Sequence, residues 1–193
     1  MKAHRIDLVM QSYCTHEIMI NLSQKSCENI LNGEKTVIVQ RRCPEYCYGR
    51  INDGQITFPK FVAYIFNKNL GVVGKSVISL LDRKVYYLDC GYDYKHNPRK
   101  YEKDIQKLNE TVDLSGTCLS IDEFRKMVGI GKHYYFAIHE FTKFDPPLPI
   151  EDFWIARFGK NGGFAPSERF KYPRTWCYAL KKSDIEDMEK ELS

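Results

Sequence analysis

Runs of β-branched and aromatic residues recur along this chain, with only short helical segments between them. The clearest runs are residues 18–22, 36–41, 61–66, 72–81 and 134–141. Such runs are typical of strands, and the 13 tyrosines and 11 phenylalanines suit half-buried sheets. Parallel α/β sheets need a crossover helix between successive strands, so the pattern argues against a Rossmann-type architecture. It predicts an α+β fold: a mixed β-barrel of five or six strands flanked by short helices.

The segments between these runs carry start and stop signals. Ser23 is a predicted cap for a helix that ends at Asn32-Gly33. Ser120, with Glu123 three residues later, forms the capping-box pattern ahead of a helix at 121–128. The remaining expectations are a pairing element at 84–88, a loop and exposed helix at 92–110, a proline-forced edge crossing at 145–149, a flexible Gly-rich loop at 159–166, a short strand at 176–180 and a charged helix at 184–192.

The length of 193 residues fits one domain, and 43% hydrophobic residues suffice for a core without disulfides or metal. We expect a single domain at 1–182 with a basic insertion at 92–110, followed by a charged C-terminal helix at 183–193. The net charge of +4 permits an acidic partner without demanding one. No secretory signal and no run of about 20 apolar residues occurs, which predicts a cytoplasmic protein without a membrane span.

Seven cysteines, an odd number without a repeated spacing, favour free thiols in a reducing compartment. Cys43 and Cys47 form C-x3-C, but no second Cys or His pair stands at zinc-finger spacing. No cofactor and no metal is therefore expected. The sequence lacks G-x-S-x-G, P-loop and H-E-x-x-H signatures. The Gly-rich residues 159–163 indicate either a plain loop, which we favour, or a phosphate cradle.

The turn and strand from Asn32 to Arg42 form the best candidate site. Gly33 permits a left-handed exit from the preceding helix, after which Lys35 and Thr36 stand at the mouth of a strand. Strand alternation puts Lys35, Val37, Val39 and Arg41 on one face and Thr36, Ile38, Gln40 and Arg42 on the other. A barrel strand with an apolar middle and cationic ends can present a cation at each rim. The alternative interpretation is that these charges are solvated strand ends.

The order of several motifs resembles the ASCH-domain family of the PUA-like superfold. These motifs are the segment 20–42 with Ile30-Leu31-Asn32-Gly33-Glu34-Lys35-Thr36, the turn 71–74, Leu114-Ser115-Gly116 with 121–124, the strand and prolines at 135–148, and the closing run 172–178. The resemblance spans about residues 18–180. It implies a pseudo-barrel with helices at its openings.

The resemblance also implies alternatives for function. ASCH domains are generally proposed to bind RNA in a cleft beside the helix-to-strand turn, and some members are ribonucleases or amidohydrolases acting on N4-acetylcytidine. In the amidohydrolases the lysine of this turn, here Lys35, works with a threonine three residues later and a remote glutamate. This chain has Ile38 at the threonine position, and Gln40 where many members carry an arginine. Binding is therefore favoured over catalysis.

Three hypotheses stay open. The first is a binding module for RNA or a nucleotide, in which cations contact phosphate and aromatic rings stack on bases. The second is an enzyme, a modified-nucleoside hydrolase or ribonuclease, with Lys35 as its catalytic residue. The third is a protein-interaction domain that uses 92–110 and the C-terminal helix.

Because Tyr134 and Tyr135 point to opposite faces of their strand, at most one of them lines the cleft. The predicted ligand-binding residues are Lys35, Thr36, Gln40, Arg41, Arg42, Tyr135, Arg174 and Trp176.

Overall fold

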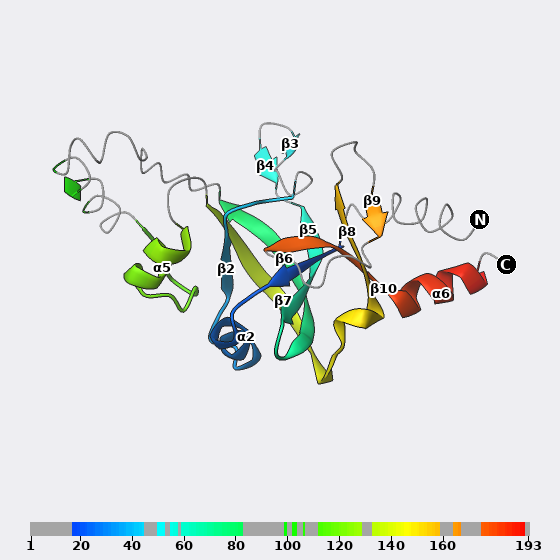
Figure 1. The fold of residues 1–193 in the computed structure, drawn as a ribbon. Coiled ribbons are helices and arrows are strands. Elements are labelled where there is room, and N and C mark those ends of the chain that lie inside the picture. The colour runs from blue at the N-terminus through cyan, green and yellow to red at the C-terminus, as the bar shows by residue number, and fades with distance from the viewer. Residues whose placement is uncertain are drawn as a thin grey trace. The chain divides into compact units, whose positions relative to one another are not determined.

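The computed structural model describes residues 17–44, 50–52, 55–57, 59–82, 99, 102–103, 106, 112–128, 133–158, 164–166 and 175–191 (Figure 1). The predicted pairing element at 84–88 lies outside these residues. Most of the insertion expected at 92–110 does so as well.

Ten strands and several short helices follow one another along the described chain. In order they are β1 (Glu17–Asn21), α2 (Gln24–Leu31), β2 (Val37–Gln40), β3 (Arg50–Asn52), β4 (Gln55–Thr57), β5 (Lys60–Asn67), β6 (Gly71–Asp82), α5 (Ile121–Val128), β7 (Tyr134–Leu148), a 3-10 turn (Ile150–Asp152), β8 (Phe153–Phe158), β9 (Phe164–Pro166), β10 (Trp176–Lys181) and α6 (Lys182–Glu191). The α+β class and most of the predicted elements are confirmed.

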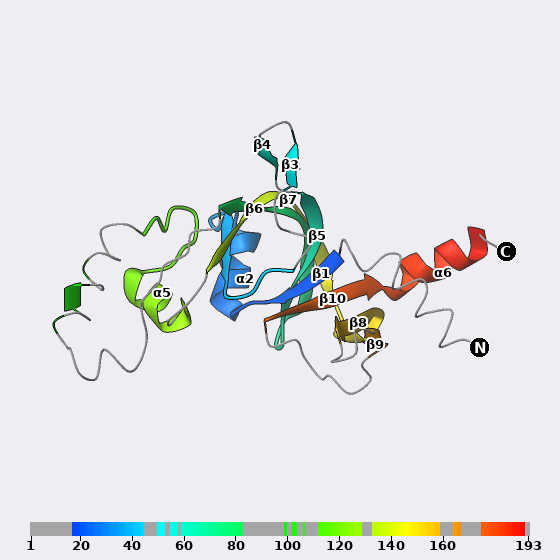
Figure 2. The ribbon, with the colours of Figure 1, turned by 90° about the horizontal axis from the view of Figure 1, so that it is seen from above.

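Eight strands form one mixed sheet in the order β2-β7-β6-β5-β1-β10-β8-β9, and β3 and β4 form a separate pair. β1 lies between β5, to which it is parallel, and β10, to which it is antiparallel (Figure 2). The predicted count of five or six strands is too low, because β8 and β9 were not recognised. Within the described residues no pairing joins β2 to β9, so the sheet is open and not the closed barrel that the strand pattern predicted.

Two segments differ from the sequence-based expectation. β7 continues through the prolines to Leu148, whereas the prediction ended the strand at Phe141. Proline is compatible with a strand wherever its missing N–H is not needed by the ladder. The predicted Gly-rich loop at 159–166 contains β9, which pairs with β8 through Phe158 and Phe164.

The chain divides into two compact units. Unit 1 is Met1–Leu31, Lys60–Ile78 and His139–Ser193, and unit 2 is Asn32–Pro59 and Ser79–Ile138. The long strands β6 and β7 therefore contribute residues to both units.

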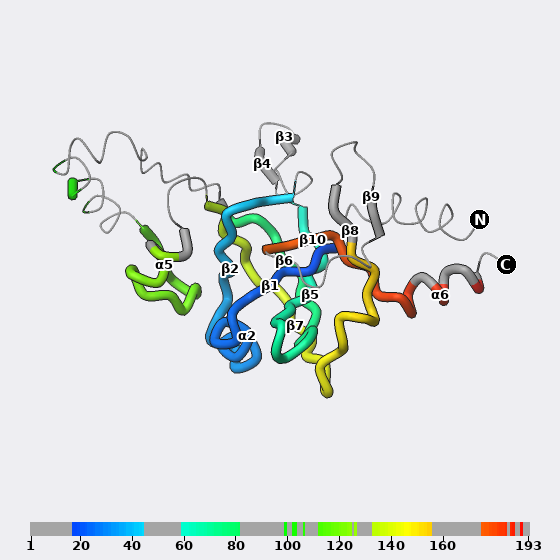
Figure 3. The backbone as a smooth tube through the Cα atoms, viewed as in Figure 1, coloured from blue at the N-terminus to red at the C-terminus, as the bar shows by residue number. Residues whose placement is uncertain are grey.

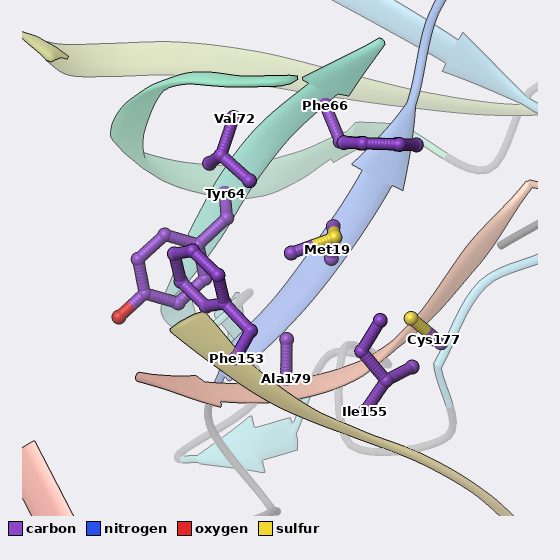
Figure 4. Close-up of a cluster of buried hydrophobic side chains, with 8 residues drawn as sticks. All are labelled: Met19, Tyr64, Phe66, Val72, Phe153, Ile155, Cys177 and Ala179. Carbon is purple, nitrogen blue, oxygen red and sulfur yellow. The ribbon is translucent and has the colours of Figure 1, made fainter. Parts of the chain in front are cut away.

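The core of unit 1 is built on β1, whose three central residues are buried. Met19 is fully buried amid side chains from β5, β6, β8 and β10 (Figure 4). The rings of Tyr64 and Phe153 meet edge to face with centroids 4.8 Å apart. A strand that is covered on both faces needs a continuous apolar run, and Ile-Met-Ile supplies it. The buried members are Met19, Tyr64, Phe66, Val72, Phe153, Ile155, Cys177 and Ala179.

The chain passes from β1 directly into α2 (Figure 3). Side-chain hydrogen bonds define the start of the helix. The Ser23 hydroxyl accepts a hydrogen bond from the Ser26 N–H at 3.2 Å, which confirms the predicted cap. Asn67 at the end of β5 donates from Nδ2 to the carbonyl of Leu22 at 2.8 Å. Cys27 and Ile30 then turn inward as the apolar face of the helix.

The core of unit 2 joins β2, β7 and α5. Val39, Phe124 and Tyr135 are buried in it, and partly buried residues pack around them: Val37, Val112, Leu114, Leu119 and Ile121. Phe124 is fully buried and, together with the partly buried Ile121, anchors α5 to the two strands.

No helix in the described part of the chain combines the length and apolarity that crossing a membrane requires. Among the same residues, no three His, Cys, Asp or Glu side chains gather closely enough to hold a metal ion. The described cysteines Cys27, Cys43, Cys118 and Cys177 are free thiols. Burial raises the pKa of Cys27 to about 12, so this thiol stays protonated and behaves as an apolar core residue.

Candidate functional site

The helix-to-strand turn adopts the geometry that its glycine predicts. Gly33 has φ +75°, which lets the chain leave α2 in the left-handed conformation. A Cβ at this position would meet nothing within 4 Å. The turn is thus open to solvent at Gly33, and the chain enters unit 2 immediately before Lys35.

Lys35 is nearly buried, with 4% of the residue exposed. Its Nζ donates a hydrogen bond to the main-chain carbonyl of Thr117. An ammonium carries three donors, and within the described part of the chain this is the single hydrogen bond that Lys35 makes. Burial lowers the pKa of Lys35 to about 8, while electrostatic interactions with Cys118 and Glu123 act in the opposite direction. The Lys35 amine is therefore mostly charged at neutral pH, although burial destabilises the charged form.

A tight loop around Gly116 supports the turn from the other side. The carbonyl of Gly116 accepts hydrogen bonds from the N–H groups of Thr36 at 2.8 Å and Val37 at 2.9 Å. Gly116 has φ +68°, and a Cβ there would lie 2.2 Å from Thr36 Oγ1. The Thr117 hydroxyl donates to the carbonyl of Leu114 at 2.6 Å and closes the loop on itself. Glycine is therefore required at 116 for both its conformation and its lack of a side chain.

The loop leads directly into the cap of α5. The Ser120 hydroxyl accepts from the Glu123 N–H at 3.2 Å, and the Glu123 carboxylate accepts from the Ser120 N–H at 2.9 Å. This reciprocal pair is the capping box that the sequence predicts. Phe124 follows it and meets the ring of His133 edge to face, with centroids 5.7 Å apart. The cap therefore holds the Glu123 carboxylate at the start of α5.

The register of β2 against β7 sets the faces of the candidate strand. Val39 pairs with Tyr135 and Gln40 with Tyr134, in antiparallel register. Directly paired residues share a face, so Val39 and Tyr135 point into the unit 2 core, while Gln40 and Tyr134 point to the other face.

The predicted site residues fall into three groups. Thr36, Arg41 and Arg42 are exposed. Lys35, Gln40 and Tyr135 are buried, and Trp176 in β10 of unit 1 is half-buried with its ring edge to face against Tyr178. Arg174 lies outside the described residues. Lys35 and the neighbouring Thr36 both bind the 114–118 loop of unit 2, through the Lys35 ammonium and the Thr36 N–H.

Three further residues lie in this loop or in the helix cap that follows it and were not predicted as site residues: Thr117, Cys118 and Glu123. Thr117 acts through its main-chain carbonyl, which no side-chain pattern reveals. Cys118 is partly exposed and has a positive φ of 54°, an uncommon conformation for a residue with a side chain. Glu123 was recognised only as a capping residue. The Leu-Ser-Gly motif was the available signal, because a glycine after a short polar turn often marks a close backbone approach.

Comparisons with protein-family models and with curated proteins find no match. A comparison with solved structures finds an ASCH protein from Zymomonas mobilis. Against its tyrosine-to-phenylalanine mutant the TM-score is 0.51, with 16% identity, over 91% of this chain and 97% of that chain. The chain has the ASCH fold. A serine-to-alanine mutant gives a TM-score of 0.49 with 16% identity, over 92% of this chain and 96% of that chain. A further ASCH structure from that organism gives a TM-score of 0.47 with 14% identity, over 91% of this chain and 95% of that chain.

The ASCH fold confirms the resemblance that the motif order predicted, and the structure accounts for one departure from it. Ile38, at the position where the resemblance implies a threonine in the amidohydrolases, is completely buried. It pairs with Phe136, which is also buried. A core contact therefore occupies the position of that hydroxyl.

Replacing Lys35 by methionine removes the titratable amine and retains a side chain of similar length. The folded pKa near 8 lies below the ordinary 10.5, so between these values the unfolded chain binds more protons than the folded one. We expect the free energy of unfolding of the wild type to rise relative to Lys35→Met by about 3 kcal/mol as the pH increases from about 8 to about 10.5. Urea unfolding of both chains across this range measures the difference. A difference independent of pH would contradict the burial of the charge.

Alanine substitutions at two glycines separate conformational strain from steric overlap. Both Gly33 and Gly116 have positive φ, which costs alanine about 1–2 kcal/mol. Only Gly116→Ala also overlaps Thr36 Oγ1, so we expect it to lose about 1–3 kcal/mol more than Gly33→Ala. Chemical denaturation of the two variants gives the comparison. Equal losses would mean that the loop does not press on the turn.

Proposed function

We propose that this protein binds RNA or a nucleotide through an anion-binding site at Lys35 and the adjoining start of β2. The buried ammonium of Lys35 carries the proposal. Taking an ammonium out of water costs several kcal/mol unless partners replace its hydration, and one carbonyl supplies one hydrogen bond. A phosphate oxygen would accept hydrogen bonds from the other N–H donors of Lys35.

Exposed groups at both ends of β2 support the same ligand. Thr36 is exposed directly next to it, and its hydroxyl can donate to a phosphate oxygen. Arg41 and Arg42 are exposed beyond the far end of β2, roughly 20 Å away at about 3.3 Å per residue. Two cationic positions so far apart suit a chain of phosphates, as in single-stranded RNA, better than one mononucleotide.

The aromatic residues enter the proposal differently. Tyr135 packs in the unit 2 core, and Trp176 is half-buried in unit 1. The proposed contacts to the ligand therefore come from the lysine and arginine side chains and the threonine hydroxyl, not from these rings. Gln40, with 8% of its surface exposed, lies on the face opposite the core residue Val39 and offers little surface to a ligand. Binding dominated by phosphate contacts is sensitive to salt and weakly dependent on sequence.

Short single-stranded RNAs labelled with a fluorophore test the proposal by anisotropy between 50 and 200 mM salt. We expect Lys35→Met to weaken binding at least about tenfold, which is about 1.4 kcal/mol. Arg42→Ala should reduce the slope of log K against log salt by about 0.7, the contribution of one phosphate contact. Lys68→Ala, which removes an exposed lysine of unit 1, serves as the matched control and should bind like the wild type. No binding by the wild type at 50 mM salt would refute the proposal.

A second candidate, hydrolysis of a modified nucleoside such as N4-acetylcytidine or cleavage of RNA, is favoured by the lowered pKa of Lys35. An amine with a pKa near 8 is a general base of useful strength near neutral pH. In that case the neutral amine is the active form, so turnover should rise as the pH increases through about 8, and Lys35→Met should abolish it. Binding by the ammonium has the opposite pH dependence. Product analysis with N4-acetylcytidine and with RNA measures turnover, and an inert wild type would exclude this candidate.

A further inference from the structure

Thr117 is a polar residue that the structure buries completely. Its exposed fraction is 0%, and a buried hydroxyl needs hydrogen-bond partners within the protein. The Thr117 hydroxyl donates to the carbonyl of Leu114 at 2.6 Å and accepts from the N–H of Leu119 at 3.3 Å. One side chain thereby ties together the parts of the loop that precede and follow residue 117.

These bonds flank the peptide whose carbonyl Lys35 contacts. That peptide joins Thr117 to Cys118, and Cys118 has a φ of 54°, which a residue with a side chain seldom adopts. Such a conformation persists only where the surrounding structure enforces it. The Thr117 N–H adds a further bond to the Leu114 carbonyl at 3.0 Å. The loop therefore sets the direction of the Thr117 carbonyl, and the hydroxyl that binds the Leu119 N–H is part of that constraint.

Two successive carbonyls of this loop hold different parts of the candidate site. The Gly116 carbonyl accepts from the N–H groups of Thr36 and Val37, so it holds the main chain at the start of β2. The Thr117 carbonyl accepts from the ammonium of Lys35, so it holds a side chain. Removing the Thr117 hydroxyl leaves the donors and the acceptor of the first pair in place. It should therefore loosen the ammonium without detaching β2.

A lysine side chain is flexible, and immobilising it when a ligand binds costs conformational entropy. A carbonyl that already holds the ammonium removes part of this cost and leaves the other N–H donors for the ligand. We propose that Thr117 is a positioning residue of the Lys35 site, whose buried hydroxyl keeps its carbonyl directed at the ammonium and so prepares the ammonium to bind a phosphate oxygen. Only the binding of phosphate rests on the proposed function, because the hold on the ammonium can be measured without a ligand.

Thr117→Val is the most direct variant, because valine has nearly the shape of threonine and lacks the hydroxyl. Thr117→Ser restores the hydroxyl without the methyl group and should behave like the wild type. Ser120→Ala is the matched control: it removes the hydroxyl that accepts from the Glu123 N–H at 3.2 Å and touches no bond of the Thr117 hydroxyl. Thr117→Cys, whose thiol bonds weakly, takes the place of Thr117→Val if that chain does not fold.

NMR of 15N-labelled protein measures the hold on the ammonium without a ligand, at low temperature and about pH 6, where Lys35 is charged. The Nζ hydrogens of a buried and bonded ammonium exchange slowly with water. We expect this exchange to be at least about fivefold faster in Thr117→Val than in the wild type, and within about twofold of the wild type in Thr117→Ser and Ser120→Ala. Circular dichroism melting verifies the fold of each variant.

RNA binding, measured by anisotropy at low salt, completes a double-mutant cycle with Lys35→Met. Thr117→Val should weaken binding at least about threefold when Lys35 is present and by less than about 1.5-fold in the Lys35→Met chain, because the hydroxyl acts through the ammonium. A residue that merely stabilises the fold would weaken binding equally in both chains.

The outcomes separate the two proposals. Unchanged ammonium exchange in Thr117→Val would overturn the role of Thr117, whatever the RNA result. Equal weakening of RNA binding with and without Lys35 would also overturn it, as would a Ser120→Ala chain whose ammonium exchanges as fast as that of Thr117→Val. Faster exchange in Thr117→Val, together with a wild type that binds no RNA, would support the hold on the ammonium and overturn the proposed function.

Discussion

The candidate site depends on the hydrogen bonds from the start of β2 to the loop around Gly116. Two successive N–H groups, of Thr36 and Val37, donate to one carbonyl, and the Lys35 ammonium donates to the next one along. These bonds join segments about 80 residues apart in sequence and determine where β2 begins. Because Ile138 also donates its N–H to the carbonyl of Thr36 at 2.9 Å, the same residues form the first rung between β2 and β7. The turn, the sheet edge and the burial of Lys35 therefore have a common origin.

The sequence predicted those elements well whose signal lies in neighbouring residues. The capping box at Ser120 and Glu123 and the buried strand around Met19 needed only neighbouring residues to be recognised. β8 and β9 were missed because Phe153–Phe158 combines a charged residue with apolar ones and Phe164–Pro166 follows glycines, so neither has a clear period. The extension of β7 through its prolines depends on which N–H groups its neighbours require, and this is a property of the sheet.

The candidate site likewise has features that neighbouring residues predict and features that they do not. Strand alternation correctly separated Val39 from Gln40, since it is a property of any extended segment. The enclosure of Lys35 could not be derived from the sequence, because the carbonyl that its ammonium contacts lies 82 positions away. Main-chain carbonyls have no residue-specific signature, so a lysine bound to one looks in sequence like any other lysine at a strand end. The resemblance to ASCH domains drew attention to Lys35 without indicating that its charge is enclosed.

Gly116 has a consequence for how related sequences can vary. Because Gly116 has no side chain, Thr36 Oγ1 can lie only 2.2 Å from where a Cβ of residue 116 would be. The two positions are therefore not independent in evolution. In a homologous chain with the same loop, a β-branched residue at position 36 requires glycine at position 116. A larger residue at position 116 requires a smaller one at position 36, together with a changed backbone at 116. Covariation between these two columns is the trace that this close approach should leave in an alignment.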